Sequence, residues 1–337
     1  MELTTVWFAL IALLWCGYFM LEGFDFGVGA LLPALGRDGA TTGEDGEKRR
    51  RLMLTTIGPH WDGNEVWLIT AVGAMFAAFP VWYATLFSSF YLPMLVVLMA
   101  LILRNVGLEY RHKRQDARWI RGWDRCIVVG SLATPFVLGT MVAALVGGLP
   151  LDARGDVSLV GALVRPTALL GGLAMVGLAV VHGAMFLSLK TVGAVSDDAR
   201  QVARRGLPAV LVVLCLYASW IASDGPLAGF LAALSVTAFS IAIVLCFRGR
   251  MKASFVGSMV AIGSIVGAAF ARIFPFAIPS SLNPVWSLSL HDAASSPYTL
   301  GIMTWAAVIF LPITLLYTAY SYWVFRRRIS LHQLAVH

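Results

Sequence analysis

The chain has 337 residues, of which 59% are hydrophobic and 13% are charged, and its mean hydropathy is +0.80. This composition excludes a soluble globular domain of this size and indicates a polytopic membrane protein. The net charge of +7 does not indicate nucleic-acid binding, because the basic residues lie in short clusters between apolar runs. The four cysteines have neither metal-ligand spacing nor a haem-attachment motif, so we expect them to be packing residues.

Nine apolar runs are long enough to cross a bilayer, which takes about 20 residues of helix. They run near 4–35, 53–79, 82–110, 124–148, 161–189, 206–223, 227–247, 253–274 and 298–325. We expect the first run to be a retained helix rather than a signal peptide, because it has neither a basic leader nor a cleavage site. The sequence therefore predicts an all-α polytopic protein with nine transmembrane helices, in a single integral membrane domain over residues 1–337.

The basic residues predict the orientation of these helices. Clusters of Lys and Arg follow the first, third, fifth, seventh and ninth runs. With nine helices all five clusters lie on one side, which the positive-inside rule identifies as the cytoplasm. We therefore expect an N-terminus outside and a C-terminus in the cytoplasm. The outer connection 274–297 contains four prolines, so we expect ordered but irregular structure there.

A short motif in the first run recurs in the fifth. Four residues of each match in spacing: Gly17, Glu22, Gly23 and Phe26 correspond to Gly177, His182, Gly183 and Phe186. The match predicts a pseudo-repeat of residues 1–150 and 160–275, with an extra C-terminal helix at 298–325. The architecture would be two four-helix bundles plus one peripheral helix, and the two repeats would be parallel in topology.

Acidic residues mark the first two runs. Glu22 and Asp25 are three residues apart, as are Asp62 and Glu65, so each pair shares one helix face. Ionisable groups at membrane depth are costly and usually mark an ion or proton path. The plain alternative is that they pair with bases and fix the packing. We favour the proton path for Asp25 and Asp62, and both interpretations stay open for Glu22 and Glu65.

Polar residues near these acids are further candidates. His60 joins the proton-path candidates, whereas Asn64 and Glu109 are structural or interface candidates. Trp61 fits an anchor at the bilayer interface. Arg104, in the third run, either snorkels to the surface or pairs with an acid of the first two runs.

Histidine content bears on haem binding. Only His60 and His182 lie at membrane depth, and haem iron usually takes an axial His, Met, Cys or Tyr. We therefore do not expect this chain to ligate several haems, and we interpret His182 as a hydrogen-bonded core histidine. The sequence indicates neither a metal site nor a catalytic residue.

Two long motifs carry a resemblance to a known family. The stretches 23–29 (GFDFGVG) and 58–69 (GPHWDGNEVWLI) resemble signatures of subunit II of cytochrome bd-type quinol oxidases. Shorter matches lie at 76–80, 279–284, 296–300 and 322–326, so the resemblance covers essentially the whole chain.

The resemblance implies a heterodimer with a homologous nine-helix subunit I in the bacterial cytoplasmic membrane. The complex would oxidise quinol and reduce dioxygen to water with protons from the cytoplasm. Subunit I would ligate two b-type haems and haem d and carry the quinol site. Subunit II would stabilise the haem-bearing half and contribute acids to a proton path. Asp25 and Asp62 match the intramembrane aspartates of the family, whereas Glu65 stands where members carry Glu or Gln.

Several alternatives stay open. A secondary transporter with an intramembrane acidic site is the competing class, and it would purify without haem. A purely structural subunit would tolerate replacement of the acids. A structural quinone or lipid between these helices, and small accessory subunits, are compatible with the sequence.

Overall fold

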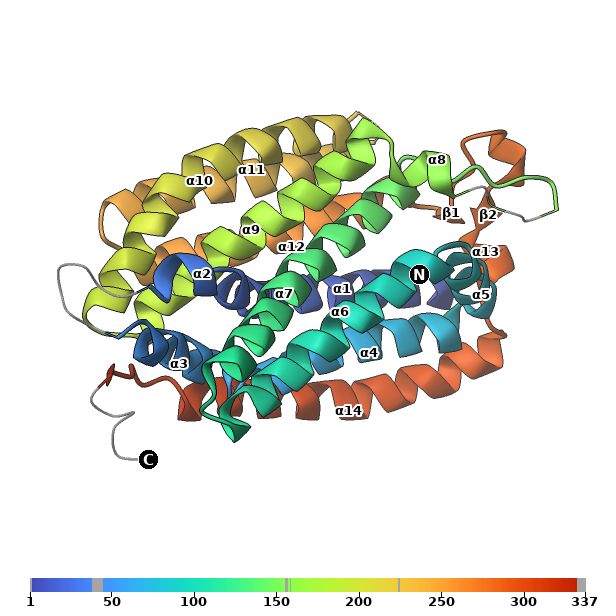
Figure 1. The fold of residues 1–337 in the computed structure, drawn as a ribbon. Coiled ribbons are helices and arrows are strands. Elements are labelled where there is room, and N and C mark those ends of the chain that lie inside the picture. The colour runs from blue at the N-terminus through green and yellow to red at the C-terminus, as the bar shows by residue number, and fades with distance from the viewer. Residues whose placement is uncertain (1, 38–44, 155–156, 158, 224, 332–337) are drawn as a thin grey trace.

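The computed structural model describes residues 2–37, 45–154, 157, 159–223 and 225–331. Long helices lie side by side along one axis (Figure 1). Eight helices of the described chain are long and apolar enough to cross a membrane. They are α1 (Leu3–Ala30), α6 (Tyr91–Tyr110), α7 (Ala117–Val146), α9 (Pro166–Lys190), α10 (Ala194–Ile221), α11 (Pro226–Phe247), α12 (Met251–Ile273) and α14 (Pro297–Val324). The expectation of an all-α polytopic protein is thereby confirmed.

The predicted helix at 53–79 is wrong as a single element. The helix α3 (Gly46–Ile57) ends before a turn at 58–60, and α4 (Trp61–Ala78) follows the turn. Pro59 has no backbone N–H with which to continue the first helix. Polar residues in the first two turns of α4 lower its hydropathy, so α4 is not among the eight apolar helices.

Other predicted boundaries also change. The run at 82–110 divides at Phe90 into α5 (Pro80–Ser89) and α6, one turn before Pro93. The helices α7 and α10 begin several residues earlier than predicted, because their first turns are polar and extend beyond the apolar run.

Local signals fix several helix starts. The helices α5, α9, α11 and α14 each have proline in the first turn, where its missing N–H costs nothing. Asp45 caps α3 and Asp116 caps α7, because each carboxylate accepts a hydrogen bond from a free backbone N–H of the first turn.

Short elements fill the connections. They are α2 (Leu32–Leu35), η1 (Arg111–Lys113), α8 (Val160–Leu163), β1 (Phe276–Ile278), η2 (Pro284–Trp286), β2 (Leu288–Ser289) and α13 (Leu290–Ala293). The strands β1 and β2 pair antiparallel, and Leu149 N donates to Pro279 O at 2.9 Å. The expectation of ordered, irregular structure over 274–297 is confirmed.

The helix α1 lies at the centre of the bundle. It contacts α7, α9 and α12 as well as α4. At its crossing with α9, Gly27 and Gly183 meet so closely that a Cβ on either would touch the backbone of the other. Small residues of this kind let membrane helices approach closely.

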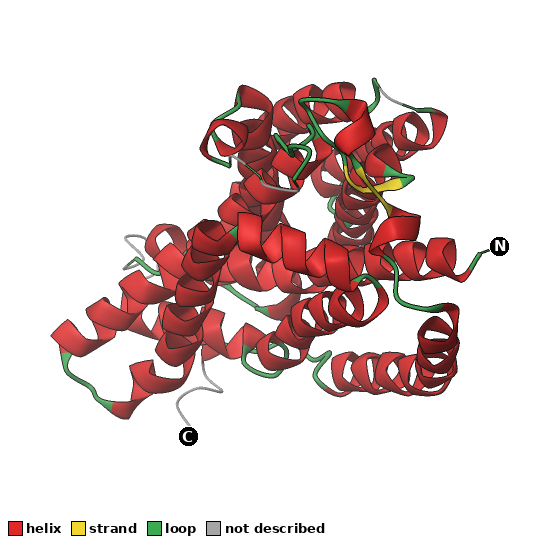
Figure 2. Cartoon of the chain, turned by 90° about the vertical axis from the view of Figure 1, so that its right-hand side faces the viewer, coloured by secondary structure: helices red, strands yellow, loops and turns green. Residues whose placement is uncertain are grey.

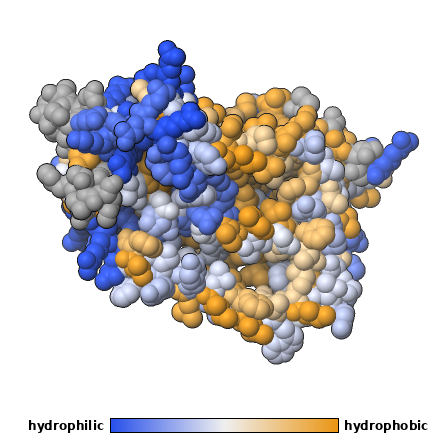
Figure 3. All heavy atoms as spheres, turned by 60° about the horizontal axis from the view of Figure 1, so that its bottom comes forward, coloured by the Kyte–Doolittle hydropathy of each residue, from blue (hydrophilic) through white to orange (hydrophobic). Residues whose placement is uncertain are grey.

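The helix α14 is peripheral and lies along the lower edge of the molecule in Figure 1. Figure 2 shows that helices make up nearly all of the fold besides the short strand pair. It packs against α1 and α4, and only 6% of its apolar window is buried. Figure 3 shows that hydrophilic side chains gather at one end of the molecule and that hydrophobic side chains cover much of the remaining visible face. The polar end carries α2, α3 and the C-terminal end of α14 (Figure 1).

Candidate functional site

Glu22 and Arg104 form an ion pair inside the bundle. Arg104 Nη1 of α6 donates to Glu22 Oε1 of α1 at 2.6 Å, and both side chains are fully buried. The guanidinium also lies over the ring of Phe26, 4.7 Å from its centroid. Arg104 therefore pairs with an acid of the first helix instead of snorkelling to the surface.

Two asparagines extend this pair into a network. Asn64 Nδ2 donates to Asp25 Oδ2 at 2.6 Å, and Asn105 Nδ2 donates to Glu65 Oε2 at 2.6 Å. Asn105 Oδ1 in turn accepts from Arg104 at 3.3 Å. We call the whole set the acid cluster: Glu22, Asp25, Asn64, Glu65, Arg104 and Asn105.

Close packing of α1 on α4 brings these groups together. A Cβ on Gly17 would lie 2.5 Å from the Trp67 ring, so the glycine makes room for the indole. The spacing of Glu22 and Asp25 turns both toward one side of α1. The three-residue spacing of the acids on α1 and the close contact of Gly17 with α4 therefore bring the members of the acid cluster together.

The acid cluster holds three carboxyl groups and one guanidinium. Glu22 Oε2 and Asp25 Oδ1 accept no hydrogen bond from an N–H or O–H of the described residues, and Arg104 Nε and Nη2 donate to none. Buried charges that are incompletely paired are costly, and binding of a proton relieves such an imbalance. The arrangement can therefore take up and release protons.

A pocket of about 780 Å³ lies beside the acid cluster, between α1, α4 and α14. Asp62, His60, Asn64 and Tyr322 line its polar part, and apolar side chains such as Phe310 line much of the rest. Asp62 is exposed and lies outside the hydrogen-bond network of the acid cluster, although it interacts electrostatically with Glu65. Asn64, and not Asp62, is the residue of α4 that hydrogen-bonds Asp25.

The two histidines at membrane depth differ in their contacts. His182 is fully buried, with Nδ1 2.7 Å from Ser258 Oγ and Nε2 3.3 Å from Met20 O. His60 is 2% exposed and stacks on the Tyr322 ring, with centroids 4.5 Å apart. Neither ring nitrogen of His60 has a hydrogen-bond partner among the described residues.

Besides Asp62, His60 and His182, two more predicted candidates lie outside the acid cluster, and two residues in or beside the cluster were missed. Trp61 is half-buried at the start of α4, and Glu109 is exposed at the end of α6. Asn105 was missed although it follows Arg104 inside an apolar run, which is a usable signal. Tyr322 was missed because a tyrosine near a helix end usually marks only the bilayer interface. The described residues include no group of three His, Cys, Asp or Glu arranged to hold a metal ion.

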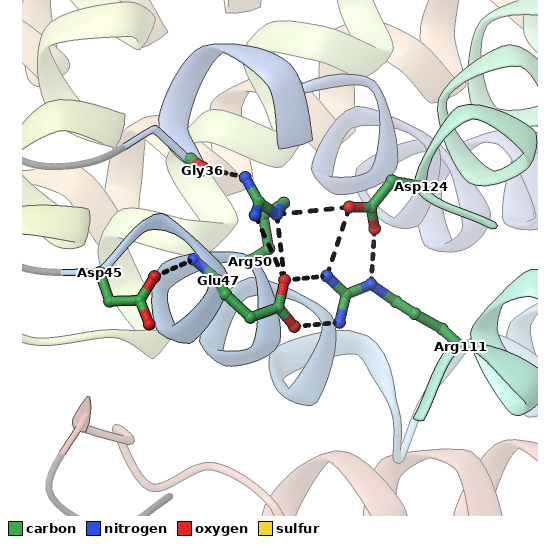
Figure 4. Close-up of polar contacts among 6 residues, drawn as sticks. All are labelled: Gly36, Asp45, Glu47, Arg50, Arg111 and Asp124. Carbon is green, nitrogen blue, oxygen red and sulfur yellow. Dashed lines mark hydrogen bonds and ion pairs between the residues drawn. The ribbon is translucent and has the colours of Figure 1, made fainter. Parts of the chain in front are cut away.

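A second set of charges lies at the polar end (Figure 4). Arg111 of η1 donates to Glu47 Oε1 and Oε2 at 2.8 and 2.7 Å, and to Asp124 Oδ1 at 2.5 Å. Arg50 Nε lies 3.3 Å from Asp124 Oδ2, and Arg50 Nη1 donates to Gly36 O at 2.5 Å. This charge cluster (Glu47, Arg50, Arg111 and Asp124) joins α3 to η1 and α7.

Comparisons with known proteins agree over nearly the whole chain. The model of the family "Cytochrome bd terminal oxidase subunit II" matches residues 3–325. Cytochrome bd ubiquinol oxidase subunit 2 of Bacillus subtilis (strain 168) is 38% identical, over 98% of this chain and 97% of that protein. Cytochrome bd-I ubiquinol oxidase subunit 2 of Escherichia coli (strain K12) is 35% identical, over 96% and 94%. Among solved structures, a chain of the bd oxidase from Geobacillus thermodenitrificans shares the fold, with a TM-score of 0.72 at 18% identity, over 96% of this chain and 97% of that one.

Proposed function

The chain belongs to the family of cytochrome bd terminal oxidase subunit II, and we propose that its buried acids carry protons toward the site of oxygen reduction. As a member of this family it is a multi-pass membrane subunit of a bacterial respiratory oxidase, an oxidoreductase complex that carries haems and contains a subunit I. The alternative of a secondary transporter is set aside by the family match.

The acid cluster carries the proposal. Three carboxyl groups and one guanidinium lie inside the bundle, next to a pocket whose lining includes Asp62 and His60. Asp62 would receive protons at the polar end, and the acid cluster would hold them at depth, because an unsolvated charge cannot cross lipid without such groups. The proposal is supported by His60, whose titratable ring stacks on Tyr322 and lines the same pocket as Asp62.

The test is quinol-driven oxygen uptake by the purified complex with Asp62→Asn, with haem content measured on the same sample. We expect uptake to fall while all haems stay bound. Asp197→Asn is the matched control, because Asp197 is an exposed acid at the polar end outside the acid cluster. Unchanged uptake with Asp62→Asn would contradict the proposal, and joint loss of uptake and haem would make Asp62 a support of the subunit interface.

We also propose that this chain ligates no haem, so that two b-type haems, haem d and the quinol site belong to subunit I. For His182, the hydrogen bonds of both ring nitrogens support this division, because a ligating nitrogen must have a free lone pair facing the iron. Reconstituting haem onto the separately expressed chain tests it.

The proposed topology has nine spans, because α4 would cross the membrane in addition to the eight apolar helices. The helix α4 runs from the polar end, where α3 lies, to the end that carries α5 (Figure 1). The polar end would face the cytoplasm, with the N-terminus outside, as the basic clusters require. Residues 1–150 and 160–275 would be repeats, a proposal that rests on the matching residues of the first and fifth apolar runs.

The periphery of the bundle is the proposed contact region. The helix α14 is apolar and largely exposed, which suits contact with a homologous nine-helix subunit I, with a small accessory subunit or with lipid. The pocket between α14, α1 and α4 is apolar over much of its wall, and would accept the tail of a lipid or of a structural quinone.

A further inference from the structure

Tyr322 links the peripheral helix α14 to the acid cluster. Its hydroxyl donates to Asn64 Oδ1 at 2.8 Å. Its ring stacks on His60, with the planes 16° apart, and meets Phe24 edge-on at a centroid distance of 6.4 Å. Because α14 packs only loosely on α1 and α4, this contact is a specific connection between the helix and the buried acids.

The Asn64 amide is held in one orientation by its partners. Its oxygen accepts from Tyr322, while its nitrogen donates to Asp25 Oδ2 and, at 3.2 Å, to Leu21 O. An amide offers one acceptor and one two-proton donor, so these bonds determine which end faces the carboxylate. Asn64 is 2% exposed, and without the hydroxyl its oxygen would lose its donor in a buried place.

We propose that Tyr322 is a positioning residue for proton transfer, acting through Asn64 on Asp25. The hydroxyl fixes the amide with its N–H groups toward the carboxylate and so sets the environment in which Asp25 exchanges protons. The inference rests on the proposed function, in which Asp25 belongs to the proton route.

Other charged groups also face Asp25. Glu22 lies on the same helix, Glu65 on α4 and Arg104 on α6, and each interacts with it electrostatically. The hydrogen bonds of these groups join Glu22 to Arg104 and Glu65 to Asn105, so none of these bonds involves Tyr322. Removing only the hydroxyl therefore tests the Asn64 connection and leaves the other partners in place.

The experiment is Tyr322→Phe in the complete oxidase, because phenylalanine keeps the ring on His60 and removes only the hydroxyl. We expect kcat for quinol-driven oxygen uptake to fall about fivefold or more, as for a buried acceptor that loses its donor. The KM for quinol and the haem spectrum should not change. The solvent isotope effect on kcat in D₂O should rise, because proton delivery then limits turnover.

The control is Tyr110→Phe at the end of α6, because Tyr110 is 51% exposed and lies outside both the pocket lining and the proposed contact helix α14. It should match the parent in all four measurements. A purely structural role for Tyr322 would instead appear as loss of haem or of the complex, and that outcome would overturn the proposal.

The variant Asp25→Asn separates this inference from the proposed function. If Asp25→Asn stops uptake with haems retained while Tyr322→Phe leaves kcat and the isotope effect unchanged, the inference fails and the proposed function stands. If Asp25→Asn leaves uptake unchanged, both fail. The double variant Tyr322→Phe/Asn64→Ala should be no slower than Asn64→Ala alone, and additive losses would contradict action through Asn64.

Discussion

At the scale of single residues, Arg104 is the one cation among the six residues of the acid cluster. Its fully buried guanidinium bonds to Glu22 and interacts with Asp25 and Glu65. A buried ion pair contributes little net stability over an apolar pair, but removal of one partner leaves the other charge uncompensated. The stability of the bundle should therefore depend on keeping both partners or replacing both.

We accordingly predict that Arg104→Met lowers the free energy of unfolding by about 3–5 kcal/mol, because Glu22 then lies buried without its cation. The measurement is the Tm of the detergent-purified complex. The double variant Arg104→Met/Glu22→Gln should recover part of the loss. Equal stability of Arg104→Met and the parent would show that the pair is solvated in the membrane.

At the scale of elements, α1 and α9 cross closely because the two residues that meet at the crossing, Gly27 and Gly183, are glycines. A Cβ on Gly183 would lie 2.5 Å from the Gly27 backbone. We predict that Gly183→Ala destabilises the subunit by about 1–3 kcal/mol, as overpacking does elsewhere. Thermal unfolding of the complex measures the effect. Gly73→Ala is the control, because its Cβ would meet open space, and it should be neutral or slightly stabilising.

The charge cluster joins α3 to η1 and α7, and α3 leads directly into the turn before Asp62. Arg111 is 6% exposed and contacts both carboxylates, whereas Arg50 is 29% exposed. We predict that Arg111→Gln lowers the Tm of the complex more than Arg50→Gln does, because both cations pair with Glu47 and Asp124 but Arg111 is the better buried of the two. The exposed Arg118→Gln serves as the reference for a charge change outside the charge cluster. Equal effects of the first two variants would contradict this ranking.

The helices were predictable from the sequence to the extent that they are apolar. Hydrophobic runs locate the eight long helices, but the break at Pro59 and the polar start of α10 lie outside what a hydropathy pattern records. The acids were predictable from their three-residue spacing. The bond between Tyr322 and Asn64 joins residues 258 positions apart, so it depends on where α14 packs.

At the scale of the whole molecule, one polar end and a largely apolar body imply a defined orientation in the membrane. The basic clusters and the charge cluster share the polar end, where hydrophilic side chains gather (Figure 3). The helix α4 is the element on which the span count depends, because its polar first turns separate it from the eight apolar helices.

Cysteine labelling in oriented vesicles tests span count and orientation together. Arg51 in α3 and Ser88 in α5 are both exposed and lie on either side of α4. We predict that a membrane-impermeant maleimide labels Arg51→Cys only in inside-out vesicles and Ser88→Cys only in right-side-out vesicles, because α4 crosses the bilayer with the basic side in the cytoplasm. The parent chain corrects for its four native cysteines. Labelling of both sites from one side would remove α4 as a span, and exchanged sides would reverse the orientation and place Asp62 away from the cytoplasmic proton supply.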